Sequence, residues 1–257
     1  MGIRRGRLVS FGFDVMIVMH GVVLTEAELA VIDEGAKFGV KTLVIMSPTI
    51  YGIGSGVRPL SSTPPSFLHH PRSPLLTSPT QLFNTISIQV PAYARTALGH
   101  GQSIVIGSGS SIWDHVHIAD LGELYTLAVV DILDYAGKNL PHGQKGIIFS
   151  ANGRATWRQV AEGVAAACVA EGVIKSTEVQ EMSLDEGSAV FYEFLENISP
   201  EHVEAGLSSN SRTVASVARR LGWRPRRGEE DWQRGFRDDV KVVLEKRRAE
   251  KRRAGSK

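Results

Sequence analysis

Short apolar runs alternate with segments of helical period from Thr25 to the end of the chain, and this alternation constrains the fold more than any other feature. Buried parallel strands read as continuous apolar runs, and crossover helices lie between them. Strand-like runs cover Thr42–Met46, Ser103–Ile106, His115–Ile118 and Gly146–Ser150. Helices are expected from Thr25 to Lys37, from Pro91 to Leu98, from Asp120, from Thr156, from Thr213 to Leu221 and from Glu229 to about Arg253. The pattern predicts an α/β protein with a mostly parallel sheet.

Several of the expected helices have recognisable ends and faces. Thr25 with Glu28 forms a capping-box pattern, and Gly39 ends that helix. Thr156 with Gln159 repeats the capping pattern. The apolar faces of the helices that start at Thr25 and near Asp120 are predicted to contain Leu29, Ile32 and Ala36, and Leu121, Leu124, Leu127, Ala128, Ile132 and Leu133, respectively.

Composition excludes several classes of protein. With 257 residues, 42% hydrophobic and 22% charged, the chain has the balance of an ordinary globular protein. A single cysteine, Cys168, excludes a disulfide framework and a Cys-rich metal site, and we expect a cytoplasmic location. Asp14 and His20 interrupt the apolar N-terminal run, which favours a buried strand over a signal peptide. No run reaches the roughly 18 apolar residues of a membrane helix, so no membrane role is expected.

Residues 57–82 do not fit the alternation. They contain six of the eleven prolines and follow neither the helical nor the strand period. We expect a disordered surface insertion, because a structureless segment of this length does not fit inside a compact domain. A proline-rich ligand for a partner domain is an alternative. A second alternative is translated intron over residues 57–81, because Val57 codons begin with GT and Gln81 can be CAG; sequencing the transcript would decide.

The C-terminal charge is concentrated. Residues 246–257 contain seven Lys or Arg and one Glu, a net charge of +6, and since the whole chain carries +2, the remainder carries −4. A nuclear-localisation or nucleic-acid patch is one interpretation. We favour a solvated helix end whose cations suit the helix dipole, and therefore expect no nucleic-acid partner.

Four motifs occur in a fixed order. PTIYGIGSG follows a strand and contains P-x-x-Y-G-x-G, carried by Pro48, Tyr51, Gly52 and Gly54. A helix and a strand come next, and then WDHVHIADL contains D-x-x-H-x-x-D-L, with Asp114 as its first residue. LGWRP follows a basic segment near the end. This order resembles the later half of the extended short-chain dehydrogenase/reductase family, the NAD-dependent epimerase/dehydratases, and in particular the fungal nucleoside-diphosphate-sugar epimerase-like proteins.

The resemblance covers roughly residues 25–56 and 83–240. It implies an incomplete Rossmann-like parallel sheet, whose N-terminal half is missing, with a small α-rich C-terminal substrate lobe. Residues 1–56 would be a remnant of the Rossmann-like domain, 57–82 the insertion, 83–240 the rest of the sheet with the substrate lobe, and 241–257 a basic helical tail.

The resemblance also implies site residues. The turn at Pro48, Thr49 and Ile50 would face the nicotinamide end of NAD or NADP. Tyr51, Trp113 and His115 would face a small-molecule substrate. Family members that act on nucleotide sugars place an Arg before the first Asp of the second motif, to pair with phosphate, and Trp113 stands there instead. A diphosphate-sugar substrate is therefore not expected.

Two parts of the family's machinery have no counterpart. The pyrophosphate-binding G-x-x-G-x-x-G, which aims a helix N-terminus at the phosphates, is missing. The acid/base pair Tyr-x-x-x-Lys is missing too, because none of the five tyrosines has a lysine four residues later. We therefore expect cofactor binding and catalysis to be lost in this chain.

The remaining candidates have structural interpretations. His115 and His117 alternate with apolar residues and should face one side of a strand, but no third ligand has suitable spacing, so no metal site is predicted. Asp120 is predicted to be a helix N-cap. Residues 107–111 are expected to form a hairpin-like loop, and Cys168 to be a small buried hydrophobe.

Two functions follow. The first is an NAD(P)-dependent oxidoreductase or epimerase-like protein acting on a small molecule, of which this chain is a truncated, inactive form. The second is a non-catalytic binding or interaction protein derived from the same fold. A parallel sheet without its first strands would expose apolar surface, so we expect poor solubility or self-association.

Overall fold

The computed structural model describes residues 25–54, 86–195 and 200–254, so the expectations for residues 1–24 and 57–82 lie outside the described part of the chain. The helices are α1 (Thr25–Lys37), α3 (Gln89–His100), α4 (Ile118–Tyr135), the 3-10 turn η3 (Gly143–Lys145), α5 (Trp157–Ala170), α6 (Leu184–Phe194), α7 (Pro200–Leu207), α8 (Ser216–Arg220) and α9 (Glu229–Ala254). The strands are β1 (Val44–Met46), β2 (Thr49–Tyr51), β3 (Ser103–Ile106), β4 (Ile112–His117), β5 (Ile147–Phe149), β6 (Gly153–Thr156) and β7 (Val179–Met182).

The described strands pair mostly in parallel. β1 pairs with β5, β2 with β4, and β3 with β7, all parallel, whereas β6 joins the other edge of β4 antiparallel. Parallel neighbours need crossover connections, and the helices between the strands supply them. The α/β class predicted from the sequence is confirmed. The hairpin expected at residues 107–111 is wrong, because β3 and β4, which this loop connects, belong to different sheets.

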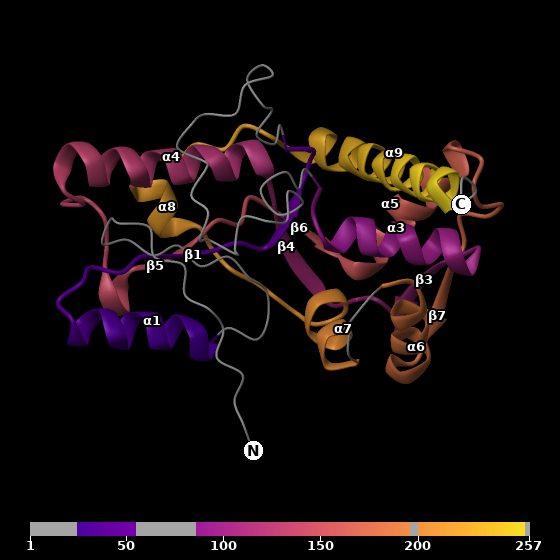
Figure 1. Cartoon of the computed structure of the whole chain (residues 1–257), viewed down its shortest axis with the longest axis horizontal. Helices are drawn as coiled ribbons and strands as arrows, with labels where there is room; N and C mark the ends of the chain where they lie inside the picture. Colours follow the sequence, from indigo (N-terminus) through magenta and orange to yellow (C-terminus); the bar gives the residue numbers. More distant parts are fainter. Residues whose placement is uncertain (1–24, 55–85, 196–199, 255–257) are drawn as a thin grey trace.

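The sheet β2-β4-β6 lies at the centre of the molecule, between two hydrophobic cores (Figure 1). Successive side chains of a strand point to opposite faces. Tyr51 and Trp113 therefore pack into one core, and Ile50 and Val116 pack into the other. The sheet therefore connects the two hydrophobic cores.

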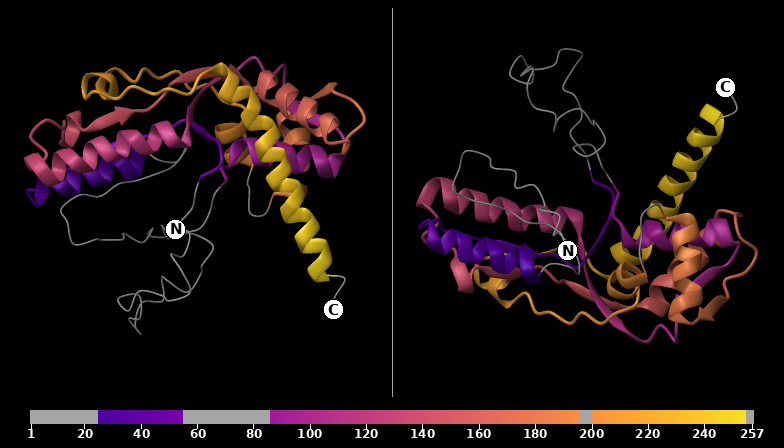
Figure 2. Two further views of the ribbon diagram at one scale, coloured as in Figure 1. Left: turned by 90° about the horizontal axis from the view of Figure 1, so that it is seen from above. Right: turned by 60° about the horizontal axis from the view of Figure 1, so that its bottom comes forward.

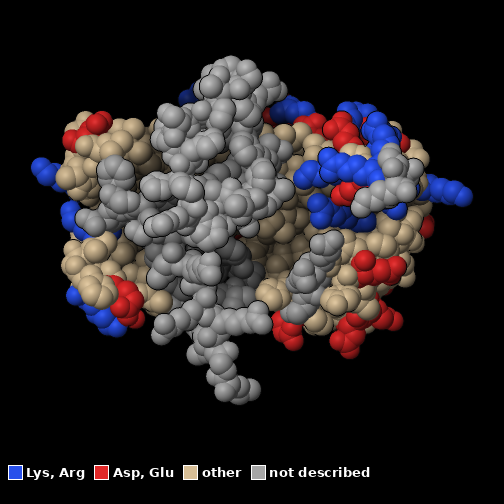
Figure 3. All heavy atoms as spheres, in the orientation of Figure 1, with Lys and Arg blue, Asp and Glu red and all other residues tan. Residues whose placement is uncertain are grey.

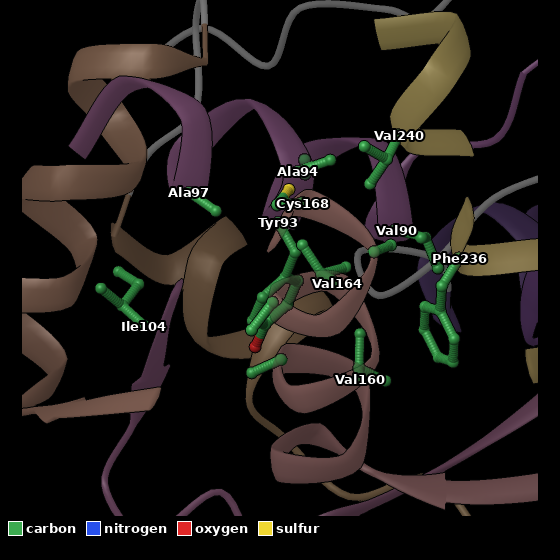
Figure 4. Close-up of a cluster of buried hydrophobic side chains, with 14 of the residues drawn as sticks. Val90, Tyr93, Ala94, Ala97, Ile104, Val160, Val164, Cys168, Phe236 and Val240 are labelled. Atoms are coloured by element: carbon green, nitrogen blue, oxygen red, sulfur yellow. The ribbon is translucent and has the colours of Figure 1, made fainter. Parts of the chain in front are cut away.

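The larger core lies on the right in Figure 1 and contains α3, α5 and α9. The predicted capping box of Thr156 and Gln159 begins α5, and the apolar face of this helix meets α3 and α9 (Figure 4). Tyr93 lies between Trp157 and Phe191, and its hydroxyl donates to the Leu207 carbonyl at 2.7 Å, which fixes α7 to the core. Cys168 is buried in this core as predicted, and burial raises its thiol pKa to about 11.

The smaller core joins α4, β1, β5 and the segment around α8. Trp223, from the LGWRP motif, is fully buried in it, and its indole Nε1–H donates to the Asp120 carbonyl at 2.7 Å. Buried indole groups need such a partner. The motif therefore anchors the end of the basic segment to the first turn of α4.

The helix predictions for α1 and for residues 213–221 need correction. Helix α1 buries Val31, Ile32 and Gly35 and leaves Leu29 and Ala36 exposed, because Gly35 approaches the Thr42 side chain where any larger residue would collide. The helix predicted from Thr213 to Leu221 is only the five residues of α8. Its predicted start is held in another conformation, because the backbone N–H and hydroxyl of Thr213 both donate to Asp114.

Helix α4 has a partly exposed apolar face, contrary to the prediction. Leu121, Leu124 and Ala128 are buried, but Leu127 and Leu133 are 39% and 65% exposed, and Val130 between them is 43% exposed. Residues 127, 130 and 133 share one side of a helix. This side forms an apolar stripe that no described element covers.

Helix α9 extends past the rest of the described chain at its C-terminal end (Figure 2). Lys and Arg side chains gather over these last turns (Figure 3). The Arg247 guanidinium donates to the Leu98 carbonyl at 3.0 Å, which ties the base of the extension to α3. None of the described helices combines the length and apolar composition needed to cross a bilayer.

Substitution of the apolar stripe on α4 tests the expected self-association. We expect the chain to associate with rising concentration, and the double variant Val130→Glu with Leu133→Lys to associate less, because charged side chains resist desolvation. Light scattering over a concentration series would measure this. Tyr192→Lys, at an exposed position on α6, is the control and should not change the result. A monodisperse wild-type monomer at high concentration would contradict the expectation.

Asp239 on α9 is a buried carboxyl group beside the larger core. It is fully buried, and neither of its carboxylate oxygens has a hydrogen-bond partner in the described structure. Burial, together with the charge of Asp238, raises the Asp239 pKa from 3.8 to about 7. The folded chain therefore holds this proton more tightly than the unfolded chain does, and stability should fall as the pH rises from about 4 to about 7.

Asp239→Asn should remove this pH dependence. Relative to wild type, the variant should gain stability on the order of 1–3 kcal/mol between pH 4 and pH 8, because it no longer has to bury a charge. Urea denaturation at both pH values would measure the difference. Asp238→Asn is the matched control and should keep most of the wild-type pH dependence. An unchanged pH profile for Asp239→Asn would show that the carboxyl is not buried and unpaired.

Candidate functional site

The two central sequence motifs meet at one edge of the sheet. Tyr51 is the last residue of β2 and His117 the last residue of β4, and the two are partners in the parallel register. Ligand sites of open α/β sheets lie outside the carboxyl ends of parallel strands. The fold thus brings P-x-x-Y-G-x-G and D-x-x-H-x-x-D-L together at such an edge, although His117 follows Tyr51 by 66 positions in the sequence.

Four rings form a cluster at this edge, which we call the ring cluster: Tyr51, His115, His117 and Trp232. The Tyr51 ring lies edge-on to His115, His117 and Trp232, with centroids 5.3, 5.0 and 4.9 Å away. His115 stacks on the Trp232 indole at 4.0 Å. Both histidines contact the same tyrosine, which confirms that they face one side of the strand.

Three glycines allow the rings to pack this closely. A side chain at Gly52 would collide with the His117 imidazole, and one at Gly153 would collide with the His115 imidazole. Gly235 on α9 places its backbone against the Tyr51 ring, where an added Cβ would lie 3.1 Å from Tyr51 Cδ2. Gly52 also has φ +88, a conformation that favours glycine. Backbone rather than open space therefore borders the ring cluster at these three points.

The ring cluster is neutral near pH 7. Burial lowers the pKa of His115 to about 4, and burial with the nearby Arg227 lowers the pKa of His117. The Nδ1 of His117 accepts the Ala119 N–H at 3.1 Å, which places the imidazole proton on Nε2. Burial, with Asp231 next, raises the Tyr51 pKa. The phenol therefore stays protonated and cannot act as a base at neutral pH.

His115 has no hydrogen-bond partner on either ring nitrogen in the described structure. Its imidazole is held by stacking and by the close backbone of Gly153 instead. The buried His115 imidazole is therefore neutral, since burying a charged imidazolium without a partner would cost several kcal/mol.

Asp120 has a different role from the predicted one. The N-cap of α4 is His117, and the helix begins two residues before Asp120. The buried Asp120 carboxylate accepts the backbone N–H groups of Arg226 and Arg227 at 3.1 and 3.0 Å, and pairs with the Arg227 guanidinium at 3.1 Å. It therefore fixes the chain that leads into α9, and through it the position of Trp232.

The other predicted site residues lie in or beside β2 and β4. Pro48 and Ile50 are half-buried, and Thr49 is buried opposite His115 in the register. Trp113 is half-buried against Trp157, with ring centroids 5.5 Å apart, and its Nε1 has no described partner. The roles predicted for these residues in cofactor and substrate binding stay predictions.

The sequence missed Trp232, Gly153 and Arg227, all of which shape the ring cluster. An aromatic residue early in the helix predicted from Glu229 carries no signal of a stack on a histidine 117 positions earlier. Among the described residues, no group of three or more His, Cys, Asp or Glu side chains is placed to hold a metal ion.

Comparison with known proteins gives distant similarities. No family model matches the chain. The oxidase ucsJ of Acremonium sp is 24% identical over 172 residues, which cover 64% of this chain and 42% of that protein. Among solved structures, a UDP-N-acetylglucosamine 4-epimerase from Methanobrevibacter ruminantium M1 is 11% identical, with a TM-score of 0.47, and the match covers 86% of this chain and 52% of that one.

Two further structures are similar to a comparable degree. A dTDP-glucose 4,6-dehydratase from Streptomyces venezuelae, solved with NAD, is 16% identical over 86% of this chain and 49% of its own, with a TM-score of 0.48. A UDP-glucose 4-epimerase from Thermus thermophilus, in complex with NAD, is 18% identical over 85% of this chain and 51% of its own, with a TM-score of 0.44. The chain spans about half the length of these structures and less than half of the curated relative.

Alanine at the glycines tests the packing of the ring cluster. Gly153→Ala should cost about 1–3 kcal/mol of stability, because its methyl group would overpack the His115 ring. Gly52→Ala should cost more, since it adds the strain of positive φ to the collision with His117. Chemical denaturation would measure both losses.

Gly39→Ala is the control for the strain alone. Gly39 has φ +66 with nothing within 4 Å of the added methyl group, so only the backbone penalty of about 1–2 kcal/mol is expected. If Gly52→Ala is no more destabilising than this control, the His117 ring is not fixed against Gly52.

Proposed function

We propose that the chain forms the substrate-side part of an NAD(P)-dependent oxidoreductase or epimerase-like protein of the extended short-chain dehydrogenase/reductase family, acting on a small molecule. The observation that carries the proposal is the register of β2 with β4, which pairs Tyr51 with His117 at the carboxyl edge of the sheet. Two motifs that match the family only as sequence are thereby placed side by side where α/β proteins bind ligands.

The described residues do not fit a complete dinucleotide. Pyrophosphate binding needs a glycine-rich turn that leads from a strand directly into a helix, so that backbone N–H groups meet the phosphates. Gly52 and Gly54 follow β2, but the sequence contains no G-x-x-G-x-x-G or G-x-G-x-x-G spacing. The predicted turn is wrong for Thr49 and Ile50, because both lie in strand β2. Together with Pro48 they would meet the nicotinamide end alone, so no chemical step through the cofactor is derived.

The ring cluster supplies shape rather than acid/base chemistry. Tyr51 stays protonated and both histidines stay neutral, so no described group here removes a proton at neutral pH. Hydride transfer at a hydroxyl or carbonyl carbon needs such a group. We therefore propose that this chain, by itself, is an inactive form.

The alternative function is a non-catalytic protein that binds a small molecule or a partner. The close packing of the rings against Gly52, Gly153 and Gly235 favours it, because a protein that no longer binds cofactor can fill the edge of its sheet with side chains. The two proposals share the fold and differ in what a longer gene product would do.

Calorimetric titration of the purified chain with NADH and NADPH tests the proposal. We expect no binding in the micromolar range with either dinucleotide, because the phosphate cradle is missing. ADP-ribose, which lacks the nicotinamide, serves as the control ligand. Micromolar binding of NADH or NADPH would overturn the proposed inactivity.

The genomic sequence upstream of Met1 distinguishes the two functions. An in-frame G-x-x-G-x-x-G in that sequence supports the oxidoreductase, and the longer product should then bind NADH and show hydride exchange. Without such a motif, the non-catalytic function is supported and the oxidoreductase is rejected.

A further inference from the structure

A hollow of about 300 Å³ lies beside the sheet, between the β4–β6 pair and the segment that leads into α8. Side chains alternate along β4, so Asp114 points to the face opposite Trp113 and His115. Asp114 is also the register partner of Arg154 on β6. The hollow is therefore separate from the ring cluster. Its lining residues are Asp114, Ala151, Asn152, Gly153, Arg154, Thr213, Val214, Ala215, Ser216 and Arg219.

The one carboxylate in this lining is already satisfied. The Asp114 side chain is 1% exposed, and it accepts from Arg154 Nε at 2.6 Å, from the Thr213 hydroxyl at 2.8 Å and from the Thr213 backbone N–H. Its negative charge is compensated by Arg154. Asp114 therefore fixes the Arg154 side chain in place and does not repel an anion in the hollow.

The Arg219 side chain, which also lines the hollow, is held by Asn152 and Trp223. Its Nη2 donates to the Asn152 side-chain carbonyl at 2.7 Å, and its guanidinium lies over the Trp223 ring at 5.0 Å. Asn152 is itself held, because its amide donates to the Arg227 carbonyl at 2.8 Å and its backbone N–H to the His115 carbonyl at 3.0 Å. An arginine held by stacking and hydrogen bonds loses less entropy on binding a ligand.

The lining therefore has a net positive charge and unused donors. Arg154 bonds through Nε and Nη2 and Arg219 through Nη2, which leaves Nη1 of each without a partner among the described residues. Guanidinium groups bind phosphate and carboxylate oxygens with two parallel hydrogen bonds. Ser216, also in the lining, supplies a hydroxyl donor.

We propose that this hollow binds a small oxyanion, the phosphate or carboxylate group of a small molecule, through the guanidinium groups of Arg154 and Arg219. The site goes beyond the proposed function, because it lies on the opposite face of the sheet from the ring cluster and needs neither a dinucleotide nor a base. Titration of the wild-type chain with inorganic phosphate, and separately with acetate, uses the two oxyanions as probes.

Thermal unfolding in phosphate is the primary measurement. Phosphate should raise the Tm of the wild-type chain more than chloride at equal ionic strength, because a ligand that binds the folded state stabilises it. Arg219→Gln should weaken phosphate binding at least tenfold by calorimetry. Val214→Glu should do the same, since Val214 is 73% exposed in the lining and a carboxylate there would occupy the arginines.

Arg220→Gln is the matched control. Arg220 is exposed on the same short helix and does not line this hollow, so the variant loses one positive charge and should bind phosphate within twofold of wild type. A preference for phosphate over acetate would assign a phosphoryl ligand, and the reverse preference a carboxylate. If Arg219→Gln fails to fold, Val214→Glu still tests the site, because it leaves the buried network intact.

Two results would overturn the proposal. One is a wild-type chain that phosphate and acetate stabilise no more than chloride does. The other is an Arg220→Gln variant that loses as much affinity as Val214→Glu, because binding would then follow the overall charge of the surface and not this hollow.

Discussion

The rest of the structure depends on β4, because both of its faces are buried and each serves a different core. Alternation along the strand sends Trp113 and His115 to the side of α5 and α9, and Asp114 and Val116 to the side of α4 and α8. β2 and β6 pair with its two edges, so its backbone groups are satisfied by neighbouring strands. A one-residue shift of β4 would exchange the faces and place Asp114 in the larger core.

Two buried carboxylates fix the C-terminal half onto this strand and the helix that follows it. Asp114 holds Thr213 and Arg154, and Asp120 holds the backbone of Arg226 and Arg227. Leaving such a carboxylate without its partner typically costs about 3–5 kcal/mol. The D-x-x-H-x-x-D-L motif therefore supplies two attachment points and, through His117, a helix cap. These roles account for most of the motif without any catalytic chemistry.

Local signals in the sequence predicted some of the elements and missed others, namely β2, β6, β7, α6 and α7. The strand Ser103–Ile106 and the capping box at Thr156 are as predicted, because both depend on residues close together in the chain. The faces of α1 and α4 were only partly right: Ile32 and Leu124 are buried as predicted, whereas Leu29 is exposed. Helical period gives two or three candidate faces, and tertiary contacts choose among them. Gly35 illustrates the difference, because it lets α1 approach the Thr42 side chain closely. The hydrophobic period of the helix does not predict this contact.

The candidate site was predictable in part. The facing of His115 and His117 toward one side follows from strand alternation. Trp232, in contrast, stacks on a histidine 117 positions earlier, and Arg227 pairs with Asp120, 107 positions earlier. Asp120 was assigned to the wrong role for the same reason. A cap is a local interaction that the sequence suggests, but the donors that Asp120 binds come from residues 226 and 227.

The protonation states in the ring cluster limit which chemistry this sheet edge can support. Burial raises the Tyr51 pKa most, and the acidic side chains of Asp231, Asp120 and Glu229 raise it further. A catalytic tyrosine needs the opposite, a nearby cation that stabilises the phenolate. Within the described part of the chain, Arg227 lowers the Tyr51 pKa, but its guanidinium is paired with Asp120. An active protein built on this edge would therefore have to receive both its base and its phosphate-binding turn from residues outside it.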